Sequence, residues 1–194
     1  TSGLGACGFG HSNKRLLNAL NDQASKLSMC SRAYHSDRTS IFLKTLCQMT
    51  GFDKAMPLNT GVEAVEAMIK ACRLYAYKVK KIEPDRAEII AMKNSYHGRT
   101  LATISLTDTN IYRENFGPLL DGVKFVPFND INALKSAINK NTCAIITEPI
   151  QGEAGVIIPD NDYFKEIRHL CDENEILLAL DEVQSGIGRT GFVL

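Results

Sequence analysis

Four short apolar runs, separated by stretches with helical periodicity, restrict the folds that this sequence can adopt. The runs lie at residues 88–92, 123–126, 143–147 and 176–180, and each has the length of a buried strand. Apolar residues recur at helical spacing in residues 13–28, 38–50, 61–80, 130–139 and 160–174. This alternation predicts an α/β fold with a mostly parallel sheet flanked by helices.

Composition places the chain among globular proteins and excludes several classes of partner. Of its 194 residues, 44% are hydrophobic and 23% are charged, and 22 basic side chains balance 22 acidic ones. Because the charges balance, the composition does not indicate nucleic acid or an anionic membrane as a partner. No apolar stretch approaches the roughly 18 residues of a membrane-spanning helix. We therefore expect neither a nucleic-acid partner nor a membrane partner.

The cysteines and the chain ends indicate the compartment and the extent of the sequence. Cysteines at positions 7, 30, 47, 72, 143 and 171 form no C-x-x-C pair, which argues against zinc, so no metal is expected. Scattered cysteines suit reduced thiols and a cytoplasmic location, with the mitochondrial matrix as the alternative. The chain starts without methionine and ends on the apolar GFVL, so we expect a piece of a longer protein.

Ligands of a parallel sheet collect beyond the carboxyl ends of its strands, and polar motifs near these ends are candidates for a site. In NTGVEA, residues 59–64, Thr60 and Glu63 form a capping signature, and Gly61 lets another group approach the start of a helix. The free N–H groups there suit a phosphate, provided that the Glu63 side chain turns away. An ordinary capped helix is the alternative.

Two further motifs follow the strands at 88–92 and 143–147. In KNSYHGRT, residues 93–100, Tyr96 and His97 offer flat rings for stacking on a planar cofactor, and Arg99 offers a two-pronged donor for a carboxylate. Turn packing is the alternative. In EPIQGEAG, Glu148 and Glu153 are candidates for an acid/base pair, with solvated loop acids as the alternative.

The run EILLAL is followed by Asp181 and Glu182, where a strand is expected to meet a loop. A buried lone carboxylate is costly unless a positive or hydrogen-bonding group meets it. Asp181 therefore has either a structural ion pair with Arg189 or a ligand as its partner.

Taken together and in this order, NTGVEA, YHGRT, EPIQGEAG and DEVQSGIGRTG resemble the class III aminotransferases of the ornithine type. These enzymes use pyridoxal phosphate and have the fold-type I architecture. The resemblance covers essentially the whole chain, and the last two motifs are specific. CSRAY at 30–34 and NFGPLLDG at 115–122 are similar to ornithine aminotransferases in particular.

The resemblance implies a role for each motif residue. Gly61 and Val62 would bind the cofactor phosphate through their N–H groups, Tyr96 would stack on the pyridine ring, and Gln184 would bond to the 3-hydroxyl. Asp181 would pair with the ring nitrogen and keep it protonated, which strengthens the ring as an electron sink and relieves the cost of burying the acid.

The remaining roles concern the substrate and the neighbourhood of the ring. Arg99 would hold a substrate carboxylate, Glu148 would lie near the ring as a catalytic residue, and Glu153 would restrain an arginine in a later part of the protein. The family's cofactor-binding lysine matches no residue here and is expected beyond residue 194, as are the small domain and a threonine from a partner subunit. The 194 residues alone should therefore be inactive.

We expect residues 1–30 to be an N-terminal segment with an interface helix, and residues 31–194 to be an incomplete cofactor-binding large domain of a homodimer. The expected reaction moves the δ-amino group of ornithine to 2-oxoglutarate. Leu4 lies where ornithine aminotransferases have a tyrosine, which resembles the acetylornithine and 4-aminobutyrate branches. These substrates, or a non-catalytic module of the same fold, are the alternatives.

Overall fold

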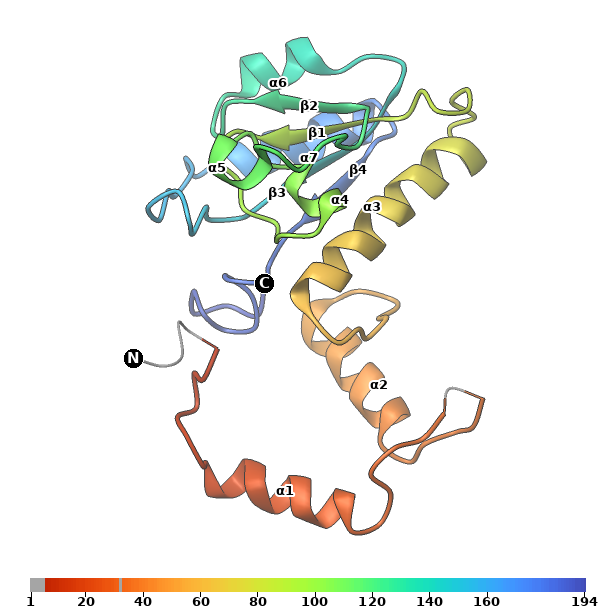
Figure 1. The fold of residues 1–194 in the computed structure, drawn as a ribbon, viewed down its shortest axis with the longest axis vertical. Helices are drawn as coiled ribbons and strands as arrows, with labels where there is room; N and C mark the ends of the chain where they lie inside the picture. The colour runs from red at the N-terminus through yellow and green to blue at the C-terminus, as the bar shows by residue number, and fades with distance from the viewer. Residues whose placement is uncertain (1–5, 32) are drawn as a thin grey trace. The chain divides into compact units, whose positions relative to one another are not determined.

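The chain forms two compact units, Thr1–Met56 and Pro57–Leu194. The computed structural model describes residues 6–31 and 33–194. Figure 1 shows that the first unit contributes α1 and α2, and that the strands all belong to the second unit.

Helices α1 (Lys14–Ala24) and α2 (Thr39–Thr50) are the regular elements of the first unit. Asn13 caps α1 with its side chain, and Gly51 ends α2 in the left-handed conformation, with φ at 76°. Both helices occur where the apolar periodicity predicts them. Neither helix has a buried residue in the described part of the chain, so their apolar faces are not covered there.

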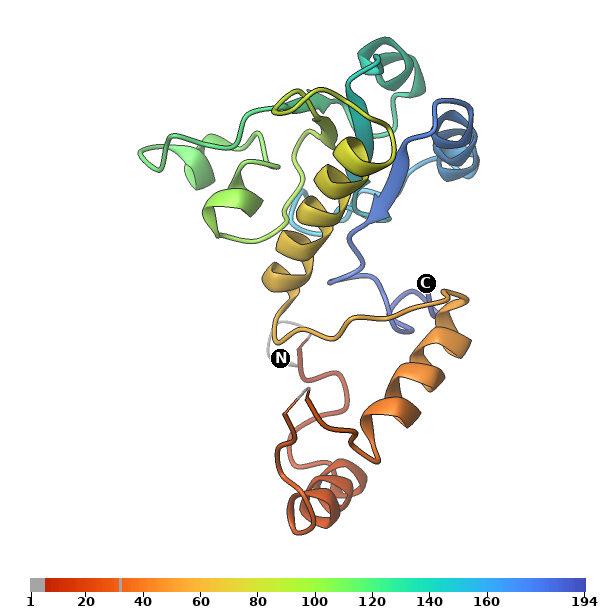
Figure 2. The same cartoon turned by 90° about the vertical axis from the view of Figure 1, so that its right-hand side faces the viewer.

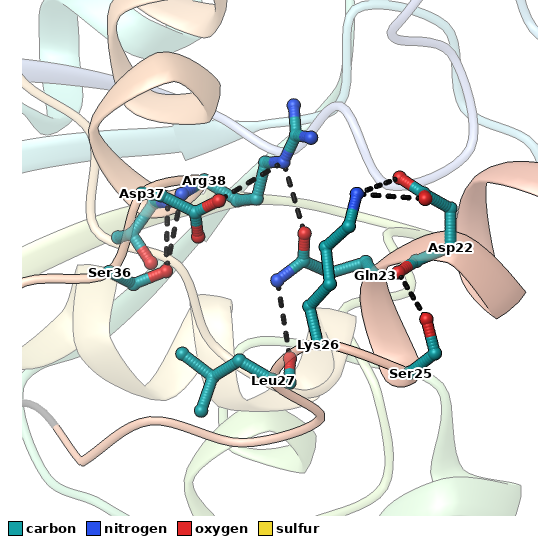
Figure 3. A network of polar contacts seen from close by, with 9 residues as sticks. Asp22, Gln23, Ser25, Lys26, Leu27, Ser36, Asp37 and Arg38 are labelled. Carbon is teal, nitrogen blue, oxygen red and sulfur yellow. Dashed lines mark hydrogen bonds and ion pairs between the residues drawn. The ribbon is translucent and has the colours of Figure 1, made fainter.

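Polar contacts join the end of α1 to the start of α2, as Figure 3 shows. Arg38 Nε donates to Gln23 Oε1 at 3.0 Å, while Gln23 Nε2 donates to the carbonyl of Leu27 at 3.2 Å. Lys26 pairs with Asp22 at 2.8 Å. The charged side chains of these contacts are exposed to solvent, so the contacts contribute little to stability.

A four-stranded parallel sheet forms the centre of the second unit. Its strands are β1 (Glu88–Met92), β2 (Val123–Val126), β3 (Thr142–Thr147) and β4 (Leu177–Leu180), in the spatial order β2-β1-β3-β4. The chain passes from β1 to one neighbour and later places β3 on the other side of β1. This change of direction between β1 and β3 is where α/β sheets open a crevice at the carboxyl ends of their strands.

Helices cover both faces of the sheet. Helix α3 (Gly61–Lys78) lies on one face, and α6 (Ile131–Ala137) and α7 (Tyr163–Glu173) lie on the other, as Figure 2 shows from the side. Two single-turn helices, α4 (Leu101–Ile104) and α5 (Asn110–Arg113), fall between β1 and β2.

Alternate strand residues enter two separate apolar cores. Ile89 and Ala91 of β1 pack in the cluster that includes α3, whereas Ile90 and Met92 pack in the cluster with α6 and α7. Because both faces are covered, the strands read as continuous apolar runs rather than as alternating patterns. Burial of β3 is complete along its whole length.

The predicted α/β class is confirmed. Strands β1 and β2 match the predicted ranges, and the other two differ by one residue at their starts. The sequence did not predict α4 and α5, and it extended the first helix beyond Ala24. None of the described helices combines the length and apolarity required to cross a membrane. The described residues also contain no cluster of three or more His, Cys, Asp or Glu side chains suited to a metal ion.

Candidate functional site

A cavity of about 520 Å³ opens at the carboxyl ends of the strands in the second unit. Its wall comes from the start of α3, the loop after β1, and the segments that follow β3 and β4. Among the site residues predicted from the sequence, those that line it are Gly61, Val62, Tyr96, Arg99, Glu148, Asp181 and Gln184. The fold therefore gathers four distant segments of the sequence around one space.

The start of α3 presents backbone donors to this cavity. Thr60 Oγ1 accepts the N–H of Glu63 at 3.2 Å, which satisfies the third N–H group of the helix. The N–H groups of Gly61 and Val62 have no acceptor within the helix. The Glu63 carboxylate folds back onto the N–H groups of Asn59, at 2.7 Å, and Thr60, at 3.0 Å. Because Glu63 turns away from the cavity wall, the positive end of the helix dipole favours an anion there.

Asp181 lies directly after β4 with only 7% of its surface exposed. Its Oδ2 atom is 2.6 Å from Nδ1 of His97, which is 3% exposed, and its Oδ1 atom accepts the N–H of Val183 at 3.1 Å. The imidazole thus meets the need of the buried carboxylate for a polar partner. His97 Nε2 is also buried and finds no hydrogen-bond partner among the described residues.

Glu148, the first residue after β3, is a second buried acid of the cavity, at 4% exposure. Its Oε2 atom accepts the N–H of Tyr96 at 3.1 Å, and its Oε1 atom accepts that of Gly152 at 3.4 Å. Burial raises the pKa of Glu148 above its usual value, and the charge of Asp181 acts in the same direction. The two N–H groups and His97 oppose this pKa shift. Glu148 thereby joins the end of β3 to the loop after β1.

Arg99 is an exposed cation at the cavity wall. Its Nε atom donates to the hydroxyl of Tyr96 at 3.0 Å, and this hydrogen bond raises the pKa of Arg99 above its ordinary value. The Tyr96 ring in turn meets Tyr112 edge-to-face, with ring centroids 5.5 Å apart. A guanidinium held through Nε keeps its two terminal nitrogens available for a carboxylate.

Glu153 lies outside the cavity wall but bonds to a residue that lines it. Gln184 Nε2 donates to Glu153 Oε1 at 3.0 Å, and both side chains are exposed. A Cβ atom on Gly152 would lie 2.0 Å from Gln184 Oε1, so glycine at this position lets Gln184 approach the turn. Glu148 and Glu153 have different environments: the first is buried in the cavity wall, and the second is exposed.

Sequence reasoning missed the pairing of His97 with Asp181. It considered His97 for stacking, together with Tyr96, although a buried acid after one strand called for a polar partner after another. His97 follows β1, which β3 separates from β4, so neighbouring strands gave no signal for this pair. Leu4, on which the sequence-based choice between substrate branches depended, lies outside the described residues.

The whole chain resembles proteins of one known family. The family model of class-III aminotransferases matches residues 1–194. An ornithine aminotransferase of Staphylococcus epidermidis is 52% identical over 190 residues, which are 98% of this chain and 48% of that protein. A second one, from Staphylococcus aureus, is 51% identical over the same shares of both chains. The chain therefore spans about half the length of the curated relatives it matches.

Solved structures show the same likeness. The ornithine aminotransferase of Toxoplasma gondii superposes with a TM-score of 0.96 at 38% identity, covering 100% of this chain and 46% of that one. The acetylornithine aminotransferase of Elizabethkingia anophelis gives a TM-score of 0.81 at 35% identity, with coverage of 100% and 45%. From the family match over its whole length, together with these identities, the chain belongs to the class-III aminotransferases.

Proposed function

We propose that the protein containing this chain is a pyridoxal-phosphate-dependent aminotransferase. It transfers the δ-amino group of ornithine to 2-oxoglutarate and gives glutamate semialdehyde and glutamate. The family, and relatives named ornithine aminotransferase at up to 52% identity, support this reaction. The single observation that carries the proposal is Asp181, a buried carboxylate that lines the cavity in the chain's second unit.

The residues present fit pyridoxal phosphate. The cavity offers unpaired N–H groups at Gly61 and Val62 for a phosphate, and the buried Asp181 for a protonated ring nitrogen. A Cβ atom on Gly61 would lie 2.9 Å from Val183 Cγ1, so a larger residue would crowd this end of the cavity. One ornithine aminotransferase of Toxoplasma gondii, 38% identical, is described with this cofactor at its active site.

Each residue has a distinct task toward the cofactor. The start of α3 would bind the phosphate, Tyr96 would stack on the ring, and Gln184 would bond to its 3-hydroxyl. When bound, pyridoxal phosphate supplies an electron sink for the electrons left on the substrate carbon as a proton departs. Asp181 would hold a proton on the ring nitrogen, and His97, at 2.6 Å, fixes the orientation of the carboxylate.

The substrate groups fall to other residues of the cavity. Arg99 binds the α-carboxylate of ornithine in a bidentate pair, because its terminal nitrogens remain available. Glu148, with both carboxylate oxygens held by backbone N–H groups, would lie near the ring of the bound cofactor as the second catalytic acid. Glu153 restrains an arginine from a later part of the protein until the oxoacid needs it.

The wider organisation follows the same proposal. Residues 1–30 form an interface segment, and residues 31–194 form part of the cofactor-binding large domain of a homodimer. The cytoplasm is the proposed compartment, with the mitochondrial matrix as the alternative. All six cysteines are free, which is consistent with either compartment. Acetylornithine or 4-aminobutyrate as donor is the second candidate function, and the likeness to the acetylornithine aminotransferase of Elizabethkingia anophelis favours the first of these two donors.

A donor comparison tests the proposed function. A full-length protein carrying this sequence is supplied with pyridoxal phosphate, 2-oxoglutarate and one of three donors: ornithine, N-acetylornithine or 4-aminobutyrate. We expect kcat/KM to be highest for ornithine, with glutamate and glutamate semialdehyde formed in equal amounts. If kcat/KM is higher for one of the other donors, that donor and not ornithine is the substrate. If no donor is turned over, the remaining hypothesis is a non-catalytic module of the same fold.

A further inference from the structure

Arg99 is exposed, and its role in binding a substrate carboxylate requires that its conformation be restrained. It lies in the loop between β1 and α4, and its side chain is exposed to solvent. A flexible arginine loses rotamer freedom when a carboxylate binds, which weakens the binding. An arginine whose loop is already fixed loses less, so contacts that restrain the loop strengthen binding.

One face of α3 restrains this loop on both sides of Arg99. Val62 and Glu66 are four residues apart and therefore share a helix face. Before Arg99, Gly98 packs so closely that a Cβ atom there would lie 2.7 Å from Val62 Cγ2. After Arg99, the hydroxyl of Thr100 donates to Glu66 Oε1 at 2.5 Å. Steric contact and a charge-assisted hydrogen bond thus flank the arginine.

The Thr100 side of the loop is fixed further by the short helix that it starts. The N–H of Thr100 donates to Thr103 Oγ1 at 3.0 Å, and Thr103 Oγ1 donates to the carbonyl of Thr100 at 3.1 Å. Thr103 is fully buried, while Thr100 lines the cavity. Glu66 is partly buried, and Thr100 is the polar partner that the structure gives its side chain.

We propose that Glu66 is a positioning residue, which anchors Thr100 and so holds Arg99 in place for the substrate carboxylate. This inference rests on the proposed function of Arg99. The same helix begins with Gly61 and Val62 at the phosphate end of the cavity. Helix α3 therefore sets the distance between the cofactor phosphate and the carboxylate of the donor.

Two variants and their combination test the anchor in the full-length protein with pyridoxal phosphate. Glu66→Ala removes the acceptor, and Thr100→Val removes the donor at nearly constant volume. Each should raise KM for ornithine about tenfold, as expected for loss of one hydrogen bond to a charged group, with kcat within about twofold. The double variant should be no worse than either single one, because the two residues act as a pair.

Controls separate positioning from a merely structural role. Glu66→Gln keeps an oxygen acceptor for Thr100 without its charge, and its KM should lie closer to that of the unmodified protein than to that of Glu66→Ala. The donor 1,4-diaminobutane has no carboxylate for Arg99, so its KM should not change in Glu66→Ala. An unchanged KM for ornithine in Glu66→Ala, or an equal rise for both donors, would overturn the proposal.

Hydrogen exchange gives a readout that needs no turnover. Amide exchange at residues 98–101, measured without substrate, should be faster in Glu66→Ala than in Glu66→Gln and the unmodified protein. Should the unmodified protein fail to turn over ornithine, the proposed function fails, and these exchange rates alone decide whether Glu66 anchors the loop. Equal rates in all three proteins would contradict the anchor whatever the substrate.

Discussion

At the scale of single residues, Asp181 shows how a buried carboxyl group is supplied with polar partners in this fold. Its carboxylate has His97 on one oxygen and the N–H of Val183 on the other. Both oxygens of the buried carboxylate therefore have a hydrogen-bonding partner, which fixes the orientation in which it would meet a protonated nitrogen. An amide at this position has nearly the same shape but cannot hold that proton.

We therefore expect Asp181→Asn in the full-length protein to retain pyridoxal phosphate through the start of α3 and to lose turnover. The loss in kcat should be about 100-fold or more, typical for removing one electrostatic group of an active site. Cofactor content by absorbance and kcat for ornithine measure the two effects separately. Asp160→Asn, which changes an exposed acid, serves as the control. Unchanged turnover in Asp181→Asn would show that this residue does not tune the cofactor.

The polar residues themselves could be predicted from the sequence, but the partner of each could not. Asp181 was conspicuous because an apolar run ended on it, but only the structure shows that it contacts His97 in the loop after β1, across the intervening strand β3. Nothing in the sequence distinguishes His97 bonded to Asp181 from His97 stacked on a ring, because the side chain suits both roles. Glu66 gave no signal, since a glutamate on a helix is usually a solvated residue.

At the scale of elements, periodicity located the long helices and the strands, and it failed for the short pieces. Helices α4 and α5 have four residues each, too few to repeat an apolar face. Helix α1 ends at Ala24, where Ser25 Oγ donates to the carbonyl of Asp22 at 2.9 Å. Such local side-chain bonds compete with the helix, and a period of 3.6 residues cannot anticipate them.

The contact between α3 and the loop after β1 leads to a prediction for Gly98. Its φ is 117°, and a Cβ atom there would lie 2.7 Å from Val62 Cγ2. Gly98→Ala should lower the free energy of unfolding by about 1–3 kcal/mol. Because Val62 must move, the affinity for pyridoxal phosphate should fall as well. Urea unfolding and cofactor titration of the full-length protein measure the two quantities.

Gly51→Ala is the matched control for this change. Gly51 also has a left-handed backbone, with φ at 76°, but a Cβ atom there would meet nothing within 4 Å. Its substitution should cost about 1 kcal/mol from backbone strain alone and leave cofactor affinity unchanged. If Gly98→Ala bound the cofactor as tightly as Gly51→Ala, the packing of the loop on α3 would have no role in cofactor binding.

At the scale of the whole molecule, the two cores enclose groups that resist ionisation. Burial raises the pKa of the Cys72 thiol to about 12, and those of Cys143 and Cys171 to about 11, from an ordinary value of 9.0. Burial likewise raises the pKa of Tyr163 from 10.0 to about 12. Cys72 and Cys143 lie in the core under α3, and Cys171 and Tyr163 lie in the core under α6 and α7.

These four groups make stability depend on alkaline pH. Each is neutral in both states below pH 9, so its contribution is fully present there. Above about pH 9 the unfolded chain loses protons that the folded chain still holds, and the free energy of unfolding should fall until about pH 11–12. Cys143→Ala removes one such group. Between pH 9 and 11 the free energy of unfolding should therefore fall less steeply in this variant than in the unmodified protein, by up to about 1.4 kcal/mol per pH unit. Urea unfolding of both full-length proteins from pH 8 to 11 measures the two slopes, and equal slopes would show that the core does not keep Cys143 protonated.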